Sequence, residues 1–258
     1  MKTPNYCLKK ITLLIFGRKY YQTVKSYKII LDYLLGKDYD DIYKSLSKLL
    51  NDESVVFDVG ANMGQWLSRL SKIIKHGKIV SIEPVLYNVL ALFRMKSLLK
   101  IKNAIIISRA ISTNIGKAEL TIPLLNNIPM GTWATFNNIR DKSLKYDKLE
   151  VDTISLDKLF DECNLNTLDF IKVDTEGFDD IVLLSGEKII SKYKPLIRMG
   201  QSFFTENCQW LRELGYIPFV IKQNEVLILD QNTSHEGDTY FCDKNMLEKI
   251  EHLMSAAI

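Results

Sequence analysis

A glycine turn that carries a carboxylate is the feature of this sequence that implies chemistry most directly. Residues 55–64 read Val-Val-Phe-Asp-Val-Gly-Ala-Asn-Met-Gly, a short apolar strand that runs into a tight turn before a helical segment. In an α/β sheet this order of strand, turn and helix builds a nucleotide-cofactor site. Gly60 allows a sharp bend, and Gly64 allows a close approach to the start of the helix.

Asp58 indicates which cofactor this turn would hold. When the nicotinamide fingerprint is aligned on Gly60, its other two glycine positions are occupied by Asn62 and Gln65. A carboxylate at the turn would repel a pyrophosphate and attract an ammonium group. S-adenosylmethionine has an α-amino group and a sulfonium but no phosphate, so Asp58 favours this cofactor.

A second carboxylate follows the next predicted strand, Lys78–Ile82, at Glu83. An acid about 20 residues beyond the glycine turn is placed to accept two hydrogen bonds from a ribose diol. Asp58 and Glu83 would then lie at the ends of adjacent parallel strands and bracket a nucleoside. The alternative is a pair of solvated strand-end acids beside an ordinary turn. As a strand-end acid, Glu83 is expected to contribute little to the fold.

Candidate catalytic groups close a later strand, residues 168–174, which ends Lys172-Val-Asp174 and is followed by Thr175-Glu176-Gly177. Asp174 and Glu176 would lie at the carboxyl edge of the sheet, where such sites form, and either could act as a general base. Lys172 is a candidate on the same strand. The alternatives are that Lys172 pairs structurally with an acid and that Glu176 caps the next helix. The two carboxylates are also hard oxygen ligands, but no third ligand is evident, so a divalent metal stays unassigned.

Two loops could add further groups to the site. His235 lies in a C-terminal loop and has a usable pKa, so it is a second candidate base, with a surface histidine as the alternative. Residues 124–147 have weak periodicity and are long for a loop, which favours a functional loop. Within it, Trp133 and Phe136 could stack on a substrate ring or anchor the loop to the core.

Composition excludes several classes of protein. The 258 residues are 47% hydrophobic and 25% charged, which is typical of a globular protein, and the net charge of +3 does not indicate a nucleic-acid partner. The four cysteines form no CxxC pair, which favours reduced thiols in the cytoplasm. No segment is long enough to span a membrane; the apolar run 11–16 leaves only docking to a membrane surface open.

Periodicity predicts an N-terminal helical extension over residues 1–50 and one α/β domain over residues 51–258. Strands alternate with helices from Val55 onward, and a hairpin of Ile217–Lys222 with Val226–Leu229 closes the pattern. Residues 179–191 are predicted to form one helix. A mostly parallel sheet with an antiparallel edge follows from this order.

The chain resembles the FkbM-type methyltransferases, a branch of the class I S-adenosylmethionine-dependent enzymes. Four motifs carry the resemblance in the right order, 57–64, 82–84, 108–110 and 170–177, with weaker support from 194–197. The resemblance implies a Rossmann-like fold with a seven-stranded sheet. It also implies a cofactor site formed by Asp58, Gly60, Ala61, Asn62, Gly64, Glu83, Pro84 and Asp174, with Arg109 or Ala110 near the adenine. One departure is that the family often has a glutamate shortly after the strand at 195–199, where this chain reads Arg198-Met-Gly-Gln-Ser202.

The predicted activity is therefore methyl transfer to a hydroxyl of a carbohydrate, with a nucleotide-activated sugar or a surface glycan precursor as candidate acceptors. Orientation of the acceptor and removal of its proton are what the protein must supply. The alternatives are a methyltransferase for a lipid or small natural product, and a catalytically silent cofactor-binding scaffold. For assembly, a homodimer is a candidate.

Overall fold

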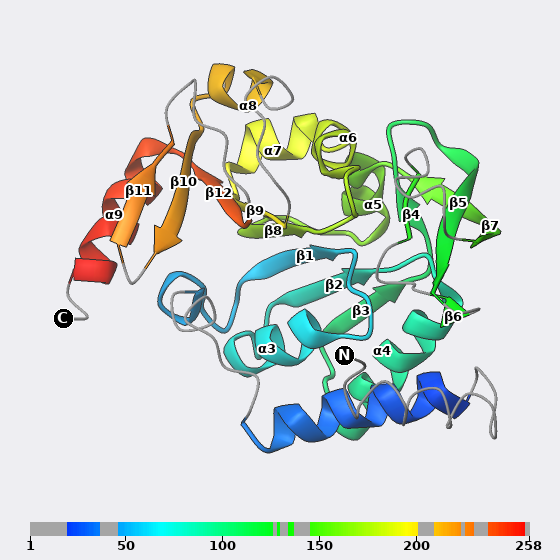
Figure 1. The fold of residues 1–258 in the computed structure, drawn as a ribbon. Helices are drawn as coiled ribbons and strands as arrows, with labels where there is room; N and C mark the ends of the chain where they lie inside the picture. Colours follow the sequence, from blue (N-terminus) through cyan, green and yellow to red (C-terminus); the bar gives the residue numbers. More distant parts are fainter. Residues whose placement is uncertain are drawn as a thin grey trace, which may run out of the picture.

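The central element of the fold is an eight-stranded sheet with helices on both faces (Figure 1). The computed structural model describes residues 20–36, 46–125, 128–129, 134–136, 145–200, 209–222, 225–229 and 237–255. Within these residues the strand order is β11-β10-β12-β9-β8-β1-β2-β3. The α/β fold with a mostly parallel sheet is thus confirmed.

Five neighbouring strands form the parallel part of the sheet. They are β1 (Val55–Val59), β2 (Lys78–Ile82), β3 (Ala104–Ile107), β8 (Phe170–Val173) and β9 (Leu196–Met199). Every residue of β1, β8 and β9 is buried. Helices cover both faces of such strands, which explains why they read as nearly continuous apolar runs.

The antiparallel edge contains one strand more than the sequence predicts. The predicted hairpin is confirmed as β10 (Ile217–Lys222) and β11 (Glu225–Ile228). Between β10 and β9 lies β12 (Thr239–Cys242), which pairs antiparallel with both. This short strand brings the sheet to eight strands instead of the expected seven.

Two layers of helices flank the sheet and bury separate apolar clusters. Helix α3 (Gln65–Ile73), α4 (Leu86–Leu98), α9 (Lys244–Ser255) and the helix at residues 20–34 contribute to one cluster. The opposite cluster includes α5 (Leu156–Glu162), α6 (Asp179–Leu184), α7 (Glu187–Tyr193) and α8 (Gln209–Glu213). Figure 1 shows α3, α4 and helix 20–34 below the central strands and α5 to α7 above them.

The predicted single helix at residues 179–191 is divided into α6 and α7 at Gly186. A side-chain carbon on Gly186 would lie 2.9 Å from the Cβ of Leu156, at the start of α5. The glycine therefore lets α5 approach the backbone closely, and the helix is interrupted at this contact.

A second, smaller sheet stands beside the first. Its strand order is β4 (Ala110–Ile111), β7 (Lys145–Ile154), β5 (Gly116–Leu125) and β6 (Ile128–Pro129). The predicted strand near 117–123 is part of β5, which pairs with β7 and lies outside the main sheet. The short extended piece expected at 151–154 is the end of β7, a strand of ten residues. Leu120, Ile122 and Val151 form a small apolar cluster of this sheet.

The N-terminal part of the described chain is helical at residues 20–34 and 46–49. Ile30, Leu46 and Leu50 are buried in the same cluster as α3. These contacts agree with packing of the predicted helical extension on the core, while its boundary near residue 50 stays a prediction. Among the helices that the structure describes, none is long and apolar enough to cross a bilayer.

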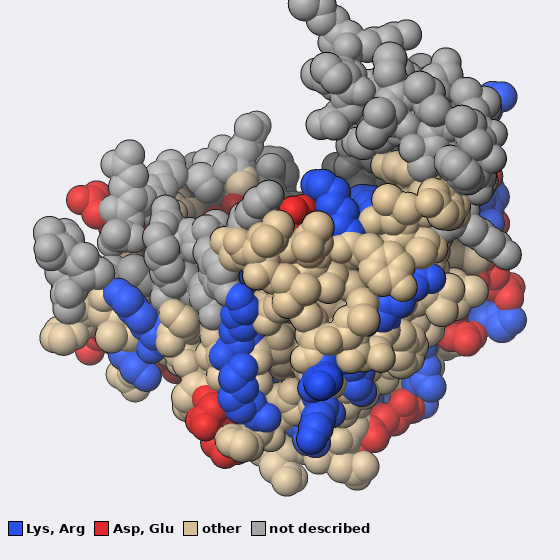
Figure 2. Space-filling view, turned by 90° about the horizontal axis from the view of Figure 1, so that it is seen from below, with Lys and Arg blue, Asp and Glu red and all other residues tan. Residues whose placement is uncertain are grey.

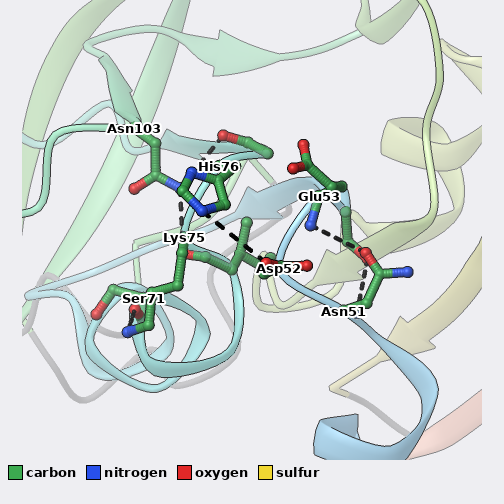
Figure 3. A network of polar contacts seen from close by, with 10 residues as sticks. Asn51, Asp52, Glu53, Ser71, Lys75, His76 and Asn103 are labelled. Atoms are coloured by element: carbon green, nitrogen blue, oxygen red, sulfur yellow. Dashed lines mark hydrogen bonds and ion pairs between the residues drawn. The ribbon is translucent and has the colours of Figure 1, made fainter.

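A hydrogen-bond network fixes the amino ends of β1 and β2 (Figure 3). The Asp52 carbonyl oxygen accepts hydrogen bonds from the backbone N–H groups of Lys75, His76 and Gly77 at 2.8–3.0 Å. The Asn103 amide donates to the carbonyl oxygens of residues 74 and 77, each at 3.2 Å. His76 thus lies at the edge of the sheet opposite to the one where catalytic groups were predicted.

Candidate active site

A cavity opens at the carboxyl edge of the main sheet, between the ends of β1, β2 and β8 and the small sheet. It encloses about 550 Å³ of empty space, a volume that includes the open solvent at its mouth. Eight of the predicted site residues line it: Gly60, Asn62, Glu83, Pro84, Arg109, Ala110, Asp174 and Glu176. The sequence did not point to the remaining lining residues: Val59, Ile82, Ile111, Leu120, Ala134, Thr135, Thr175 and Phe178, with Phe136 from the predicted loop.

The glycine turn is shaped by contacts within the protein. Gly60 has φ +70°, and a side-chain carbon there would lie 2.1 Å from the carbonyl oxygen of Asp174. Its N–H and that of Ala61 both donate to the carbonyl oxygen of Ile82 at 3.0 Å. Gly60 is therefore required for the close approach of β1 to the end of β8.

Gly64 also serves packing, and neither it nor Ala61 is among the cavity residues. Gly64 has φ +100°, and a side-chain carbon there would lie 2.8 Å from the sulfur of Met95 in α4. Ala61 is buried in the apolar cluster on that face of the sheet. In this structure Gly64 thus makes room for helix α4.

Asn62 offers an unsatisfied acceptor to the cavity. Its backbone has φ +52°, in the left-handed region that asparagine tolerates. The side-chain oxygen, Oδ1, is buried and has no hydrogen-bond partner among the residues that the structure describes. Buried polar atoms are nearly always paired, so this oxygen is a suitable acceptor for a donor group of a bound ligand.

Glu83 joins the two segments that flank the cavity. One carboxylate oxygen accepts the N–H of Asn62 and the other accepts the N–H of Val85, both at 2.9 Å. The side chain is 4% exposed. Burial raises the pKa of Glu83 to about 7, and the hydrogen bonds to Val85 and Asn62 counteract part of this rise. A carboxylate has about four acceptor sites, so two remain for the hydroxyls of a ribose.

Asp58 and Lys172 form a buried ion pair beneath the turn. Lys172 Nζ lies 3.2 Å from Asp58 Oδ1 and donates to the carbonyl oxygens of Val59 at 3.0 Å and Gly60 at 2.7 Å. Burial raises the pKa of Asp58, and the nearby Lys172 opposes that rise. Neither side chain lines the cavity. Lys172 therefore pairs structurally with an acid, as the alternative interpretation of the sequence had it. In this structure the Asp58 carboxylate contacts Lys172 and not the cavity.

Asp174 and Glu176 are two acids that follow β8 and line the cavity. Glu176 has φ +55°, an uncommon conformation for this residue type and one that is enriched at active sites. The N-cap residue of α6 is Phe178, whose side chain makes no capping hydrogen bond; a capping role for Glu176 stays a prediction. A side-chain carbon on Gly200 would lie 2.7 Å from Asp174 Cγ, so Gly200 leaves room for this carboxylate.

The predicted loop 124–147 is shorter than expected at both ends, because residues 124–125, 128–129 and 145–147 belong to β5, β6 and β7. Between β6 and β7 the structure describes Ala134 to Phe136, which line the cavity. Thr135 pairs with Thr121 of β5 in an isolated bridge, and its hydroxyl donates to the Glu176 carbonyl oxygen at 3.1 Å. The rings of Phe136 and Phe178 have centroids 5.1 Å apart. Phe136 thus contacts the turn after β8 as an anchor would, while Trp133 lies outside the described residues.

Arg198 is a buried cation that sequence reasoning did not assign. It pairs with Lys172 in the β8–β9 register and is 7% exposed. Its guanidinium lies 2.6 Å from Asp238 Oδ2 and 4.8 Å from the ring centre of Trp66. The signal in the sequence is a charge inside the apolar run Leu196–Met199.

His235 and the residues that follow Gly200 up to 208 lie outside the described part of the chain. The role of His235 as a base therefore stays a prediction. Within the described residues, no group of three or more His, Cys, Asp or Glu side chains could hold a metal ion.

Comparison with protein families gives one match. The family model described as the methyltransferase FkbM domain matches residues 58–218, which is more than half of the chain. The matched span includes both strand-end acids, Asp58 and Glu83, and the pair that follows β8, Asp174 and Glu176. No curated protein sequence matches the chain.

Several methyltransferases are among the solved structures to which this chain is similar. A methyltransferase FkbM from Methylobacillus flagellatus has 16% identity and a TM-score of 0.47, covering 74% of this chain and 44% of that protein. This chain thus spans less than half of that enzyme's length. A SAM-dependent O-methyltransferase from Thermotoga maritima has 13% identity and a TM-score of 0.44, covering 83% and 71%. An rRNA methylase from Streptococcus thermophilus has 12% identity and a TM-score of 0.44, covering 78% and 93%.

Proposed function

Because the chain belongs to the FkbM methyltransferase family, as its sequence predicted, we propose that it transfers the methyl group of S-adenosylmethionine to a hydroxyl of a carbohydrate. Methyltransferase activity and the methyl donor follow from the family. The acceptor is our proposal; a nucleotide-activated sugar and a surface glycan precursor are the candidate forms.

The residues of the cavity fit the donor. Glu83 has two acceptor sites left for the ribose hydroxyls after its bonds to Asn62 and Val85. The buried Oδ1 of Asn62 is an acceptor that a bound donor group would satisfy. Asp174 supplies a carboxylate beside Gly60 for the α-amino group, a role first assigned to Asp58. Bound there, S-adenosylmethionine supplies a methyl group on a positively charged sulfur.

The observation that carries the proposed chemistry is the presence of Asp174 and Glu176 in the same cavity as Glu83. An alcohol is a poor nucleophile, so a group that takes its proton is expected near the acceptor oxygen. Glu176 is our candidate for this base, because the Thr135 hydroxyl holds its backbone at the cavity wall. Asp174 would orient the reacting groups from the opposite side of the turn.

A carbohydrate suits the character of this cavity. Sugar hydroxyls donate hydrogen bonds to carboxylates, and the apolar face of a sugar ring packs on aromatic side chains such as Phe136 and Phe178. A nucleic acid would bring phosphates to a cavity whose lining includes Glu83, Asp174 and Glu176, which is unfavourable. These features support a sugar over a nucleic acid as the acceptor.

The first experiment measures binding and transfer in sequence. Calorimetry should show binding of S-adenosylhomocysteine but not of NADH. Methyl transfer is then measured with nucleotide sugars, glycan fragments, lipids and small phenols. Transfer to a sugar hydroxyl supports the proposal. Transfer only to a lipid or a phenol would refute the acceptor class, and binding without transfer to any compound would indicate a scaffold.

The identity of the base and the need for a metal are tested on the same transfer reaction. Glu176→Gln should lower turnover strongly, whereas Glu119→Gln, on an exposed position of β5, should leave it unchanged. If His235→Ala slows transfer and Glu176→Gln does not, the base comes from the C-terminal loop. If a chelator stops transfer and Mg²⁺ or Mn²⁺ restores it, Asp174 and Glu176 are better described as metal ligands.

We also propose a reducing compartment such as the cytoplasm. Cys163 and Cys242, the two cysteines among the described residues, are both free thiols. Structural disulfides form in oxidising compartments, so free cysteines support the cytoplasm.

A further inference from the structure

The helix at residues 20–34 carries an apolar stripe that faces solvent. Its members recur every three or four residues, are 44–65% exposed and are Tyr20, Val24, Tyr27, Leu31 and Leu34. The opposite side of the same helix contains Ser26 and Ile30, which are buried against the core. The helix thus has large apolar side chains on two sides, and of these only one side is buried against the described part of the chain.

Helix α4 repeats this pattern beside it. Its exposed large apolar side chains, 46–63% accessible, are Leu86, Leu90, Phe93 and Leu98, while Leu92 and Met95 are buried in the core. The two helices are in contact, because Arg94 Nη1 of α4 lies 3.5 Å from Ser26 Oγ. We call the exposed stripes of helix 20–34 and α4, together, the basal face. Scattered exposed apolar residues are ordinary, but two adjacent stripes mark an interaction surface.

The basal face lies in a positively charged part of the chain. In the sequence no Asp or Glu precedes Asp32, and none lies between Glu83 and Glu119. The helices that form the face carry four cations, Lys25, Lys28, Arg94 and Lys96, and Lys100 follows α4. They carry one acid, Asp32, which lies 3.2 Å from Lys28. Figure 2 views the molecule from the side of these helices and shows bands of Lys and Arg across a surface of uncharged residues, with Asp and Glu mainly toward its margins.

We propose that the basal face docks on an anionic lipid surface. Exposed leucine, valine and aromatic side chains would enter the boundary between headgroups and acyl chains, and flanking lysines and arginines would contact the lipid phosphates. Each such cation near an anionic membrane adds to the attraction. The cytoplasmic leaflet has this charge, so the docking is compatible with the proposed compartment.

The positive charge of the basal face favours a membrane over a second copy of the chain as its binding partner. In a two-fold symmetric dimer the same patch meets itself, so the cations of one copy would oppose those of the other. Such like-charge contacts disfavour the pairing. A nucleic acid would match the charge but would leave the apolar stripes without partners. An anionic lipid surface satisfies both the apolar and the charged side chains.

Docking through this face would also bring the cavity close to the membrane. The exposed stripe of α4 begins at Leu86, two residues after Pro84, which lines the cavity. An acceptor carried on a lipid would then be delivered to the mouth of the site. The inference itself concerns only the surface and holds whether or not the acceptor is a carbohydrate.

The experiment is co-sedimentation of the full chain with vesicles of phosphatidylcholine alone or mixed with phosphatidylglycerol. We expect binding to the mixed vesicles and at least tenfold weaker binding to the neutral ones. The double variant Leu31→Glu, Leu34→Glu should weaken binding to mixed vesicles about tenfold or more. Its matched control is Leu184→Glu, a leucine that is 42% exposed on α6, on the other side of the sheet; this variant should bind like the native protein.

Charge is tested in the same assay. Lys28→Gln with Lys100→Gln should weaken binding to mixed vesicles several-fold, and Lys188→Gln on α7 should not. Circular dichroism of every variant verifies that the fold is retained. Equal binding of all variants, or no binding to mixed vesicles, would overturn the proposal. So would sedimentation velocity that shows a dimer dissociated by Leu31→Glu, Leu34→Glu in a protein that does not bind vesicles.

Discussion

Glu83 provides a quantitative test of the site, because its pKa links the fold to pH. The pKa rises from 4.5 to about 7 on burial. At about 1.4 kcal/mol per pKa unit, the rise corresponds to about 3 kcal/mol of folding free energy. Because the folded-state pKa is the higher one, this stability is fully present below pH 4.5 and is lost as the pH rises to about 7.

We therefore expect native protein and Glu83→Gln to differ in the pH dependence of unfolding. Urea titrations at pH 5, 6, 7 and 8 give the free energy of unfolding of each. Between pH 5 and 8 the native protein should lose about 2–3 kcal/mol more than the variant. Other buried acids, such as Asp58 and Asp179, titrate in both proteins and cancel in the difference. Parallel curves for the two proteins would refute the reasoning.

Two further measurements separate this effect from a general loss of stability. Glu119→Gln, at an exposed acid of β5, should keep the native pH dependence. Binding of S-adenosylhomocysteine should strengthen as the pH rises through about 7, because the ionised Glu83 carboxylate accepts hydrogen bonds from the ribose more strongly. That trend should be absent in Glu83→Gln. A trend retained in the variant would mean that another group binds the ribose.

Three other predictions concern the turn and the acids around it. Gly60→Ala should unfold the turn and abolish binding of S-adenosylhomocysteine, whereas Gly116→Ala, which also has a positive φ but meets no atom within 4 Å, should cost only about 1 kcal/mol and retain binding, as calorimetry would show. Lys172→Met should lower the free energy of unfolding in urea titrations by about 3–5 kcal/mol, because it leaves the buried Asp58 carboxylate unpaired. A loss no larger than that caused by replacing an exposed lysine with methionine would contradict the pairing. Glu176→Gln should lower turnover about 100-fold or more with a much smaller change in cofactor affinity. Asp174→Asn should also lower turnover, but it should weaken cofactor binding as well, because its carboxylate is proposed to hold the α-amino group. Unchanged turnover in both variants would exclude the two acids as the base.

The strand–turn–strand frame of the site was predictable from the sequence. The apolar runs that end at Asp58, Glu83 and Asp174 form neighbouring parallel strands, as the pattern indicated. Parallel strands buried on both faces leave a strong apolar signal, and the acids at their ends meet at one edge of the sheet for geometric reasons.

The role of each acid depended on contacts between segments far apart in the sequence. Asp58 and Glu83 looked equivalent, but Lys172 lies directly opposite Asp58 in the β1–β8 register and draws its charge away from the cavity. Glu83 was expected to matter little for folding, yet it binds the backbone N–H groups of Asn62 and Val85. Neither fact follows from spacing, because register between distant strands is set by packing.

The elements that the sequence did not reveal are those with weak local patterns. The first six residues of β7 are exposed or only partly buried, so this part of the strand shows only a weak alternation of apolar and polar residues. Strand β12 has four residues, too few to show a period, and it is recognised only by its partners β9 and β10. Pairing between strands, rather than local propensity, stabilises both.

The most direct test of the account is a crystal structure of the protein with S-adenosylhomocysteine. We expect the ligand in the cavity, with both ribose hydroxyls within hydrogen-bond distance of the Glu83 carboxylate and the sulfur facing Asp174 and Glu176. A ligand bound elsewhere, or one whose ribose does not contact Glu83, would contradict the central claim that this edge of the sheet is the site of methyl transfer.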